Sequence, residues 1–256
     1  MSGTTRAAAS ESRRPRRLAA VGLAAASIAV AVAAPAVVGE ARSWQGAREH
    51  PKVVIGVDSG SDEQVALGEV YRQMFFSMGR DAETRAVDTR HGVHAVDLLA
   101  EDGVDFTVAC TGTLLTQLDR AAAEKLAGDM AAPAPGTAEP EGAKETYDAA
   151  VSALPGDVTT VDLSPAEGCA DVAGDTGGSA LELPRNLIPI FPKAEFTRDE
   201  TQRINFINRA LDTKGVADMA RKVSGGEPAT EAVRGWLREQ ARTEVRDSPD
   251  TTQIRG

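Results

Sequence analysis

An alternation of short apolar runs with helical patterns limits the fold of this chain more than any other feature of its sequence. The apolar, β-branched runs Lys52–Val57, Ala82–Val87 and Val104–Ala109 predict three strands. Between them, Glu63–Met78 and His91–Glu101 predict helices, because their apolar residues recur at helical spacing. A β-α-β-α-β succession requires right-handed crossovers, so it predicts an open α/β sheet with mostly parallel strands.

The rest of the chain predicts that this sheet belongs to a single three-layer α/β domain over residues 52–245. Residues 129–143 predict a flexible loop, and residues 164–181, rich in Gly and Asp, show no periodicity. We expect residues 42–51 to form a linker and residues 246–256 to form a disordered tail. The further predicted helices and strands are Thr113–Leu126, Tyr147–Leu154, Arg198–Thr213, Val216–Val223 and Thr230–Glu244 (helices), and Val158–Leu163 and Asn186–Pro192 (strands).

Residues 1–41 have the pattern of an export signal. A cluster of arginines precedes an apolar run, residues 18–38, that carries no charge. Small residues that suit a signal peptidase occur at Ala34–Ala36 and at Gly39–Ala41. The run is also long enough to span a bilayer if it is not removed. We therefore expect an extracytoplasmic protein, either secreted or anchored to the membrane through residues 18–38 alone.

The charge and motif content exclude several classes of function. The formal net charge is −10, whereas nucleic-acid binding needs concentrated Lys and Arg. The sequence lacks a serine nucleophile elbow, a phosphate loop and a paired-carboxylate signature, so we expect neither an enzyme nor a cofactor.

A metal site has only a weak signal. His91 and His94 could share a helix face, with Asp88 and Asp97 nearby. The chain has 3 histidines in all, and solvated helix residues explain the pattern better. We expect no metal site.

The two cysteines, Cys110 and Cys169, both follow the export signal. An even number of cysteines in an oxidising compartment favours a disulfide, and two separate buried thiols are the alternative.

Four segments of this chain resemble those of a known family, in the same order along the chain. They are "SGSDEQVALGEVYRQMF" and "VDFTVACTGTLL" in the first half, and "LPGDVTTVDLSPAEG" and "LPRNLIPIFPKAEFTRDETQRINFINRALDT" in the second. The segments resemble the substrate-binding proteins of glycine betaine, choline and carnitine ABC transporters. That family has the type II periplasmic-binding-protein fold.

The resemblance implies that most of a second domain is missing. Family members have two α/β domains with the ligand in the cleft between them, and the second domain comes from the middle of the chain. Between Val172 and Leu181 this chain has only "AGDTGGSA". We therefore expect the first domain alone, with a short loop in place of the second.

The resemblance also implies a ligand site at two strand-to-helix turns, suited to a small polar or zwitterionic solute. The residues are Ser59, Ser61 and Gln64 in the first turn and Thr111, Gly112 and Thr113 in the second. The same residue types cap helices, and Ser61 with Gln64 also matches a capping box, so both interpretations stay open. The Glu-Tyr pair of the family is Ala109–Cys110 here, which removes an aromatic ring that would face a quaternary ammonium.

In the family, the segment that contains Cys169 approaches the cleft. The resemblance therefore implies a Cys110–Cys169 disulfide that holds this loop over the old ligand site.

Two functions remain. The first is an extracytoplasmic solute-binding-like protein with altered or lost ligand binding, whose partner is an ABC transporter permease. The second is an envelope accessory protein that docks to a membrane or secreted partner and binds no solute.

Overall fold

The computed structural model describes residues 51–87, 94–101, 103–131, 140–169 and 181–242. They belong to the second of two units of the chain, Glu49–Gly256. The predicted signal or anchor, most of the linker and the predicted tail lie outside the described residues. Among the helices that are described, none combines the length and the apolarity needed to cross a membrane.

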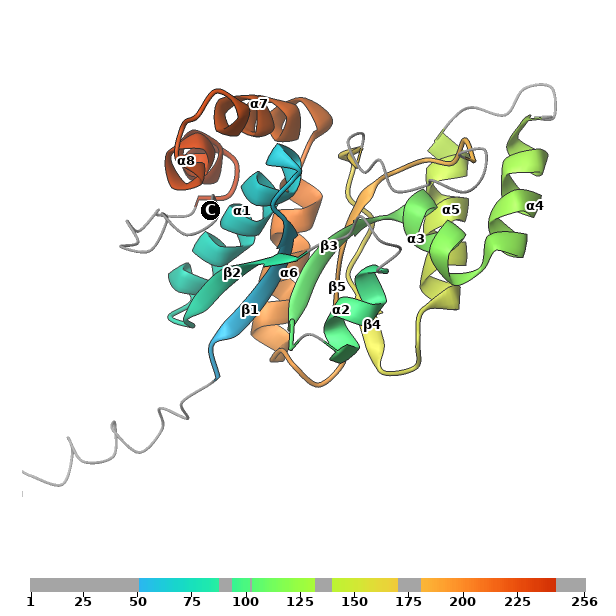
Figure 1. Ribbon diagram of the computed structural model, residues 1–256, viewed down its shortest axis with the longest axis horizontal. Coiled ribbons are helices and arrows are strands. Elements are labelled where there is room, and N and C mark those ends of the chain that lie inside the picture. The colour runs from blue at the N-terminus through green and yellow to red at the C-terminus, as the bar shows by residue number, and fades with distance from the viewer. Residues whose placement is uncertain (1–50, 88–93, 102, 132–139, 170–180, 243–256) are drawn as a thin grey trace, which may run out of the picture. The chain divides into compact units, whose positions relative to one another are not determined.

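The described residues form five strands and eight helices. Figure 1 shows their arrangement. The strands are β1 (Val53–Asp58), β2 (Ala82–Val87), β3 (Phe106–Cys110), β4 (Val158–Thr160) and β5 (Leu187–Pro192). The helices are α1 (Asp62–Ser77), α2 (Ala95–Glu101), α3 (Thr111–Leu118), α4 (Arg120–Ala131), α5 (Pro140–Ala153), α6 (Arg198–Ala210), α7 (Thr213–Ser224) and α8 (Ala229–Glu239).

The strands form one sheet in the order β2-β1-β3-β5-β4. β1 is parallel to β2 and to β3, while β5 is antiparallel to both β3 and β4. Four strands therefore run in one direction and β5 in the other, which confirms the predicted open, mostly parallel α/β sheet. β5 is also the first strand after residues 170–180, which the structure does not describe.

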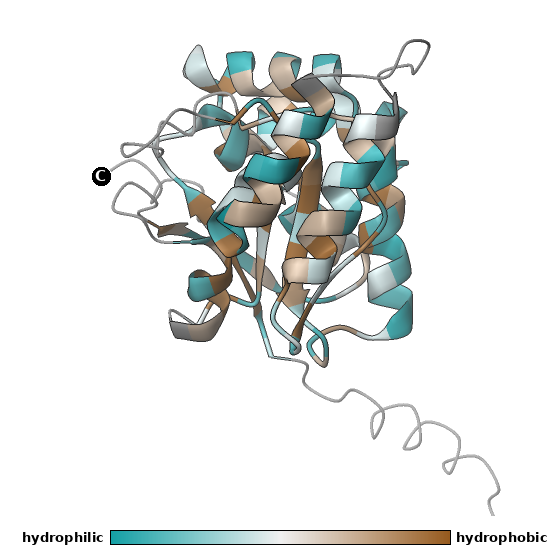
Figure 2. Cartoon of the chain, turned by 90° about the vertical axis from the view of Figure 1, so that its right-hand side faces the viewer, coloured by the Kyte–Doolittle hydropathy of each residue, from teal (hydrophilic) through white to brown (hydrophobic). Residues whose placement is uncertain are grey.

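Helices cover both faces of the sheet and make the three layers expected. One face packs on α1, α6, α7 and α8, with five mutually packed rings at its centre: Tyr71, Phe75, Phe106, Phe191 and Phe196. The other face packs on α2, α3 and α5 through Ala109, Leu114, Ile188 and Ile190. Figure 2, viewed from the side of α4 and α5, shows hydrophobic strands behind helices that carry hydrophilic residues.

The chain departs from the expected elements near α3 and α4. One helix was expected over Thr113–Leu126, but two helices meet at Asp119. Asp119 leaves the helical region (φ −146°, ψ 84°), and its Oδ1 accepts the backbone N–H of Ala122 at 2.9 Å. This carboxylate begins a new helix rather than continuing the old one, as Asp does at an N-cap.

Other bounds differ as well: α8 ends at Glu239 rather than at Glu244, and α5 and β4 also depart from their expected ranges. α5 begins at Pro140, inside the predicted flexible loop, where proline suits the first turn of a helix. β4 ends at Thr160, and the next two backbone carbonyls accept hydrogen bonds from side chains rather than from a neighbouring strand. Val161 O accepts the Tyr147 hydroxyl at 2.9 Å, and Asp162 O accepts the amide of Asn208 at 2.7 Å.

Candidate functional site

The predicted ligand residues lie at one edge of the sheet, where β1 and β3 end and α1 and α3 begin. Because β1 and β3 are adjacent and parallel, their carboxyl ends meet at the same edge. We call residues 58–64 and 110–113 the β1/β3 edge. The structure therefore brings the two predicted turns together, as the resemblance implied.

In the first turn, Ser61 is a helix cap. Its Oγ accepts the backbone N–H of Gln64 at 3.3 Å, and its own N–H donates to Asp58 O at 3.1 Å. Ser61 and Gln64 are buried, whereas Ser59 is exposed. The capping interpretation of Ser61 is thus realised, and a contact of these residues with a ligand stays a prediction.

In the second turn, Thr111 is fully buried beneath the chain that leads into β5. Its N–H donates to Asn186 O at 3.0 Å, and its hydroxyl donates to Pro184 O at 2.8 Å. The same hydroxyl accepts the Asn186 N–H at 3.2 Å. The N–H of Gly112 donates to Pro184 O at 3.0 Å, while Thr113 is half-buried. The first two N–H groups of α3 are therefore used within the protein.

Gly112 allows this close approach because it has no Cβ. A Cβ built on Gly112 would lie 2.8 Å from Leu183 Cβ and 2.8 Å from Pro184 O. The backbone oxygen cannot move aside as a flexible side chain could. The glycine is thus explained by packing, whatever its role toward a ligand.

The segment that covers the edge is the connection between β4 and β5. We call its described parts, residues 164–169 and 181–187, the crossover. The two parts pair with each other: Gly168 N–H donates to Arg185 O, and Leu187 N–H donates to Ala166 O, both at 2.9 Å. Asn186 also donates its side-chain amide to Ser164 O at 3.1 Å. The expected replacement loop "AGDTGGSA" falls in residues 170–180, outside the described residues.

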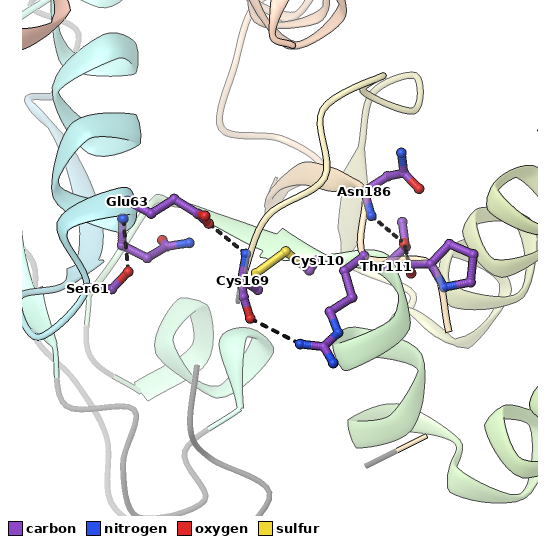
Figure 3. The surroundings of a disulfide bond; sticks show 9 residues. Ser61, Glu63, Cys110, Thr111, Cys169 and Asn186 are labelled. Carbon is purple, nitrogen blue, oxygen red and sulfur yellow. Dashed lines mark hydrogen bonds between the residues drawn. A yellow bond between two sulfur atoms is a disulfide. The ribbon is translucent and has the colours of Figure 1, made fainter. Parts of the chain in front are cut away.

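A disulfide joins the crossover to the end of β3 (Figure 3). Cys110 and Cys169 are bonded across a sequence separation of 59 residues, and both residues are buried. The predicted bridge is therefore confirmed, and the alternative of two free thiols is wrong.

Helix α1 holds the other side of Cys169. A carboxylate oxygen of Glu63 accepts the Cys169 N–H at 2.7 Å, and Arg185 donates to Cys169 O at 3.4 Å. Cys169 has a φ of 57°, in the left-handed region that side-chain-bearing residues rarely adopt. The crossover is therefore fastened to α1, β3 and α3 at once.

Sequence reasoning did not identify Glu63, Pro184 or Asn186 as residues of this edge. Their contacts span between 73 and 106 residues of sequence and mostly involve backbone atoms, which carry no residue-specific signal. Only the resemblance, which placed the loop near the cleft, indicated where the crossover lies.

Of the four residues in the weak metal pattern, His94 and Asp97 lie in the described part of the chain. Asp97 Oδ2 accepts the backbone N–H of His94 at 3.1 Å, so Asp97 caps α2. Asp88 and His91 lie outside that part. Within the described ranges, no three His, Cys, Asp or Glu side chains gather closely enough to hold a metal ion.

A hollow of about 520 Å³ lies on α6, away from the predicted residues. Its lining residues are Gln202, Asn205, Phe206, Arg209, Ala210 and Gln240. Phe206 is 46% exposed, and the Arg203 guanidinium lies 4.9 Å from its ring centroid. None of the predicted ligand residues lines this hollow.

Comparison with known proteins shows the fold of this chain alone. No family model and no curated protein matches the chain. Among solved structures it is similar to apo YehZ from Escherichia coli, with a TM-score of 0.51 and 11% identity, over 75% of this chain and 100% of that one.

Two further solved structures are similar. One is a glycine betaine/carnitine/choline ABC transporter protein, with a TM-score of 0.48 and 12% identity, over 74% of this chain and 98% of that one. The other is lactococcal OpuAC in its closed, liganded form with glycine betaine, with a TM-score of 0.40 and 12% identity, over 75% of this chain and 96% of that one. The chain thus has the α/β fold of a type II periplasmic-binding-protein lobe, the fold it shares with YehZ.

Proposed function

We propose that this chain is an extracytoplasmic protein of the solute-binding type whose ligand edge is closed by its own crossover. It then acts through contact with an ABC transporter permease or another envelope protein rather than by enclosing a betaine-type solute. One observation carries the proposal: the N–H groups of Thr111 and Gly112 already donate to Asn186 O and Pro184 O. A solute carboxylate would have to displace these bonds to reach the start of α3.

The charge at the edge also disfavours a solute carboxylate. Asp58, Asp62 and Glu63 lie within six residues of one another and are all partly buried. Like charges repel more strongly where water is partly excluded. A zwitterion whose carboxylate approached the start of α1 would meet this negative potential.

A cage for a quaternary ammonium lacks rings at the edge. The five rings of the sheet face pack on one another, with centroids 4.6 to 6.1 Å apart. Two other phenylalanines, Phe76 and Phe206, face the guanidinium groups of Arg72 and Arg203. Ala109 and Cys110 replace the pair that supplies a ring in the resembling family. These seven rings therefore already pack on one another or face arginines, and the pair that replaces the family's Glu-Tyr brings no ring for a cation–π contact at this edge.

Two features of the sequence and the fold support an extracytoplasmic location. The N-terminal pattern is that of an exported chain, and the buried disulfide suits an oxidising compartment. The proposal places the domain outside the cytoplasm, secreted or held by residues 18–38.

A thermal-shift titration tests the proposal. The purified, oxidised chain is titrated with glycine betaine, choline and carnitine, and a two-domain betaine-binding protein serves as the positive control. We expect no saturable rise in melting temperature for this chain, because a ligand raises it only by binding the folded state. A saturable rise with any of the three solutes contradicts the closed edge and makes the chain a single-lobe receptor.

A further inference from the structure

The crossover is held over the β1/β3 edge in a conformation that its own backbone disfavours. Cys169 has a φ of 57° although it carries a side chain. Its neighbour Gly168 is pressed so closely that a Cβ there would lie 2.6 Å from Glu63 Oε1 and 2.7 Å from Leu187 Cδ2. Such positions persist only where surrounding bonds enforce them, and they often mark parts of a protein that move.

Cys169 itself makes three of the bonds that hold the crossover in place. Cys169 is fastened by the bridge to Cys110, by its N–H to the Glu63 carboxylate and by a 3.4 Å bond from Arg185 to its carbonyl. Two residues earlier, Glu167 N–H donates to the Thr213 hydroxyl at 3.0 Å. The disulfide is the one covalent tie among these contacts.

We propose that the Cys110–Cys169 bridge is a clasp that keeps the crossover over the β1/β3 edge, and that reduction of the bridge opens the edge while the rest of the domain stays folded. Opening frees the N–H groups of Thr111 and Gly112 from Pro184 O and Asn186 O. These N–H groups at the start of α3 then face solvent. This proposal rests on the closed edge described above.

Reduction of the Cys110–Cys169 bridge requires a dithiol as the reductant. A protein or small-molecule dithiol is oxidised to its disulfide, and its two electrons and two protons convert the bridge into the thiols of Cys110 and Cys169. Both residues are buried, with 1% and 5% of their surface exposed. The bridge is therefore reached only when the crossover opens briefly, which makes the oxidised clasp durable.

Trypsin offers a direct readout, because Arg185 is the only Lys or Arg between residues 164 and 187. Cleavage after Arg185 requires the crossover to leave the edge. Arg80 is the control site within the fold, since it is buried and bonded to Glu195 and Glu200. The exposed Arg242 is the control for protease activity.

The proteins compared are the oxidised chain, the same chain reduced with dithiothreitol, and the double variant Cys110→Ala/Cys169→Ala. Loss of the clasp is expected to speed cleavage after Arg185 by about tenfold, because cleavage of a locally opened segment follows its open population. Cleavage after Arg80 and Arg242 is expected to change by less than about twofold.

A second variant, Cys110→Ala/Cys169→Gly, separates the clasp from the strained backbone. Glycine adopts a positive φ without penalty, so the crossover in this variant is expected to be cut more slowly than in the alanine pair.

Two results overturn the proposal. One is an unchanged cleavage rate after Arg185 once the bridge is gone. The other is an equal acceleration at Arg80, which means that the whole domain unfolds. Neither result depends on solute binding, so a failure of this proposal is distinguishable from a failure of the proposed function.

Discussion

Glu63 and Cys169 lie 106 residues apart in sequence, and the Glu63 carboxylate accepts the Cys169 N–H at 2.7 Å. The bond ties the first turn of α1 to the crossover, on the side opposite the disulfide (Figure 3). It is a charge-assisted bond to a buried backbone N–H, so it is stronger than a neutral pair.

Replacement of this carboxylate is expected to destabilise the domain. Glu63→Ala leaves the Cys169 N–H without its acceptor, which costs about 1–3 kcal/mol of unfolding free energy. Urea denaturation measures the change. The control is Glu124→Ala, which removes an exposed ion pair with Arg120 and is expected to cost less than about 0.5 kcal/mol. Equal effects of the two variants would show that Glu63 does not hold the crossover.

A methyl group at Gly112 tests the contact between α3 and the crossover. Gly112→Ala places a Cβ against Pro184 O and Leu183 Cβ, and overpacking of this kind costs about 1–3 kcal/mol. Gly128→Ala is the matched control, because Gly128 lies in α4 and a Cβ at this residue would have no neighbour within 4 Å. There the same change is expected to stabilise by about 0.5–1 kcal/mol through helix propensity. Thermal unfolding of both variants shows whether each substitution stabilises or destabilises the domain. An unchanged stability of Gly112→Ala contradicts the close packing.

The sequence was most predictive where periodicity was strict. β1, α1 and β2 follow from an unbroken alternation of one apolar run, one amphipathic helix and another apolar run, and β2 was predicted with its observed bounds. α3 and α4 were merged, because the apolar spacing continues through Asp119 and only the local cap interrupts the helix. Hydrophobic periodicity reports a buried face and does not report such a cap.

At the edge, the sequence indicated the two turns and the cysteine pair but not the closure. A helix N-terminus leaves its first N–H donors without partners inside the helix, and Thr111 and Gly112 find theirs in the crossover. Their partners are the backbone oxygens of Pro184 and Asn186, and every residue type carries such an oxygen. A long-range contact between backbone atoms therefore leaves no residue-specific trace.

A buried ion pair within α1 is hydrogen-bonded to Thr230 of α8 and offers a test of the helical layer. The Arg72 guanidinium donates two bonds to the Glu69 carboxylate, at 2.6 and 2.7 Å, and Thr230 donates to the same carboxylate at 2.8 Å. Arg72→Met leaves that carboxylate buried without its cation, which is expected to cost about 3–5 kcal/mol. Lys125→Met, at an exposed pair with Asp129, is the control and is expected to cost less than about 0.5 kcal/mol. Urea unfolding that shows similar losses for both variants contradicts this account.

The stability of the domain at acid pH depends in part on Glu200. Burial alone raises the pKa of its carboxyl, but hydrogen bonds from Thr197 and Arg80 outweigh burial, so the pKa is lowered from its usual 4.5. A lowered folded-state pKa gives stability that is present above pH 4.5 and is lost as the pH falls through the folded pKa.

Glu200→Gln is therefore expected to lose stability at pH 7 and to show a shallower decline on acidification below pH 4.5 than the parent chain. Urea midpoints measured between neutral and acid pH give both quantities. Glu239→Gln, on the exposed end of α8, is the control and is expected to follow the parent. An unchanged acid slope in Glu200→Gln contradicts the assignment.

Residue-resolved hydrogen exchange of the oxidised chain tests the closed β1/β3 edge most directly. The N–H groups of Thr111 and Gly112 are compared with that of Val108 in β3, as a protected reference, and with that of Ser59 at the exposed turn. The crossover bonds predict that Thr111 and Gly112 exchange slowly, within about tenfold of Val108, because both donate to carbonyls of the crossover. Exchange as fast as that of Ser59 contradicts the account, since it means that these donors face water and that a ligand can reach them.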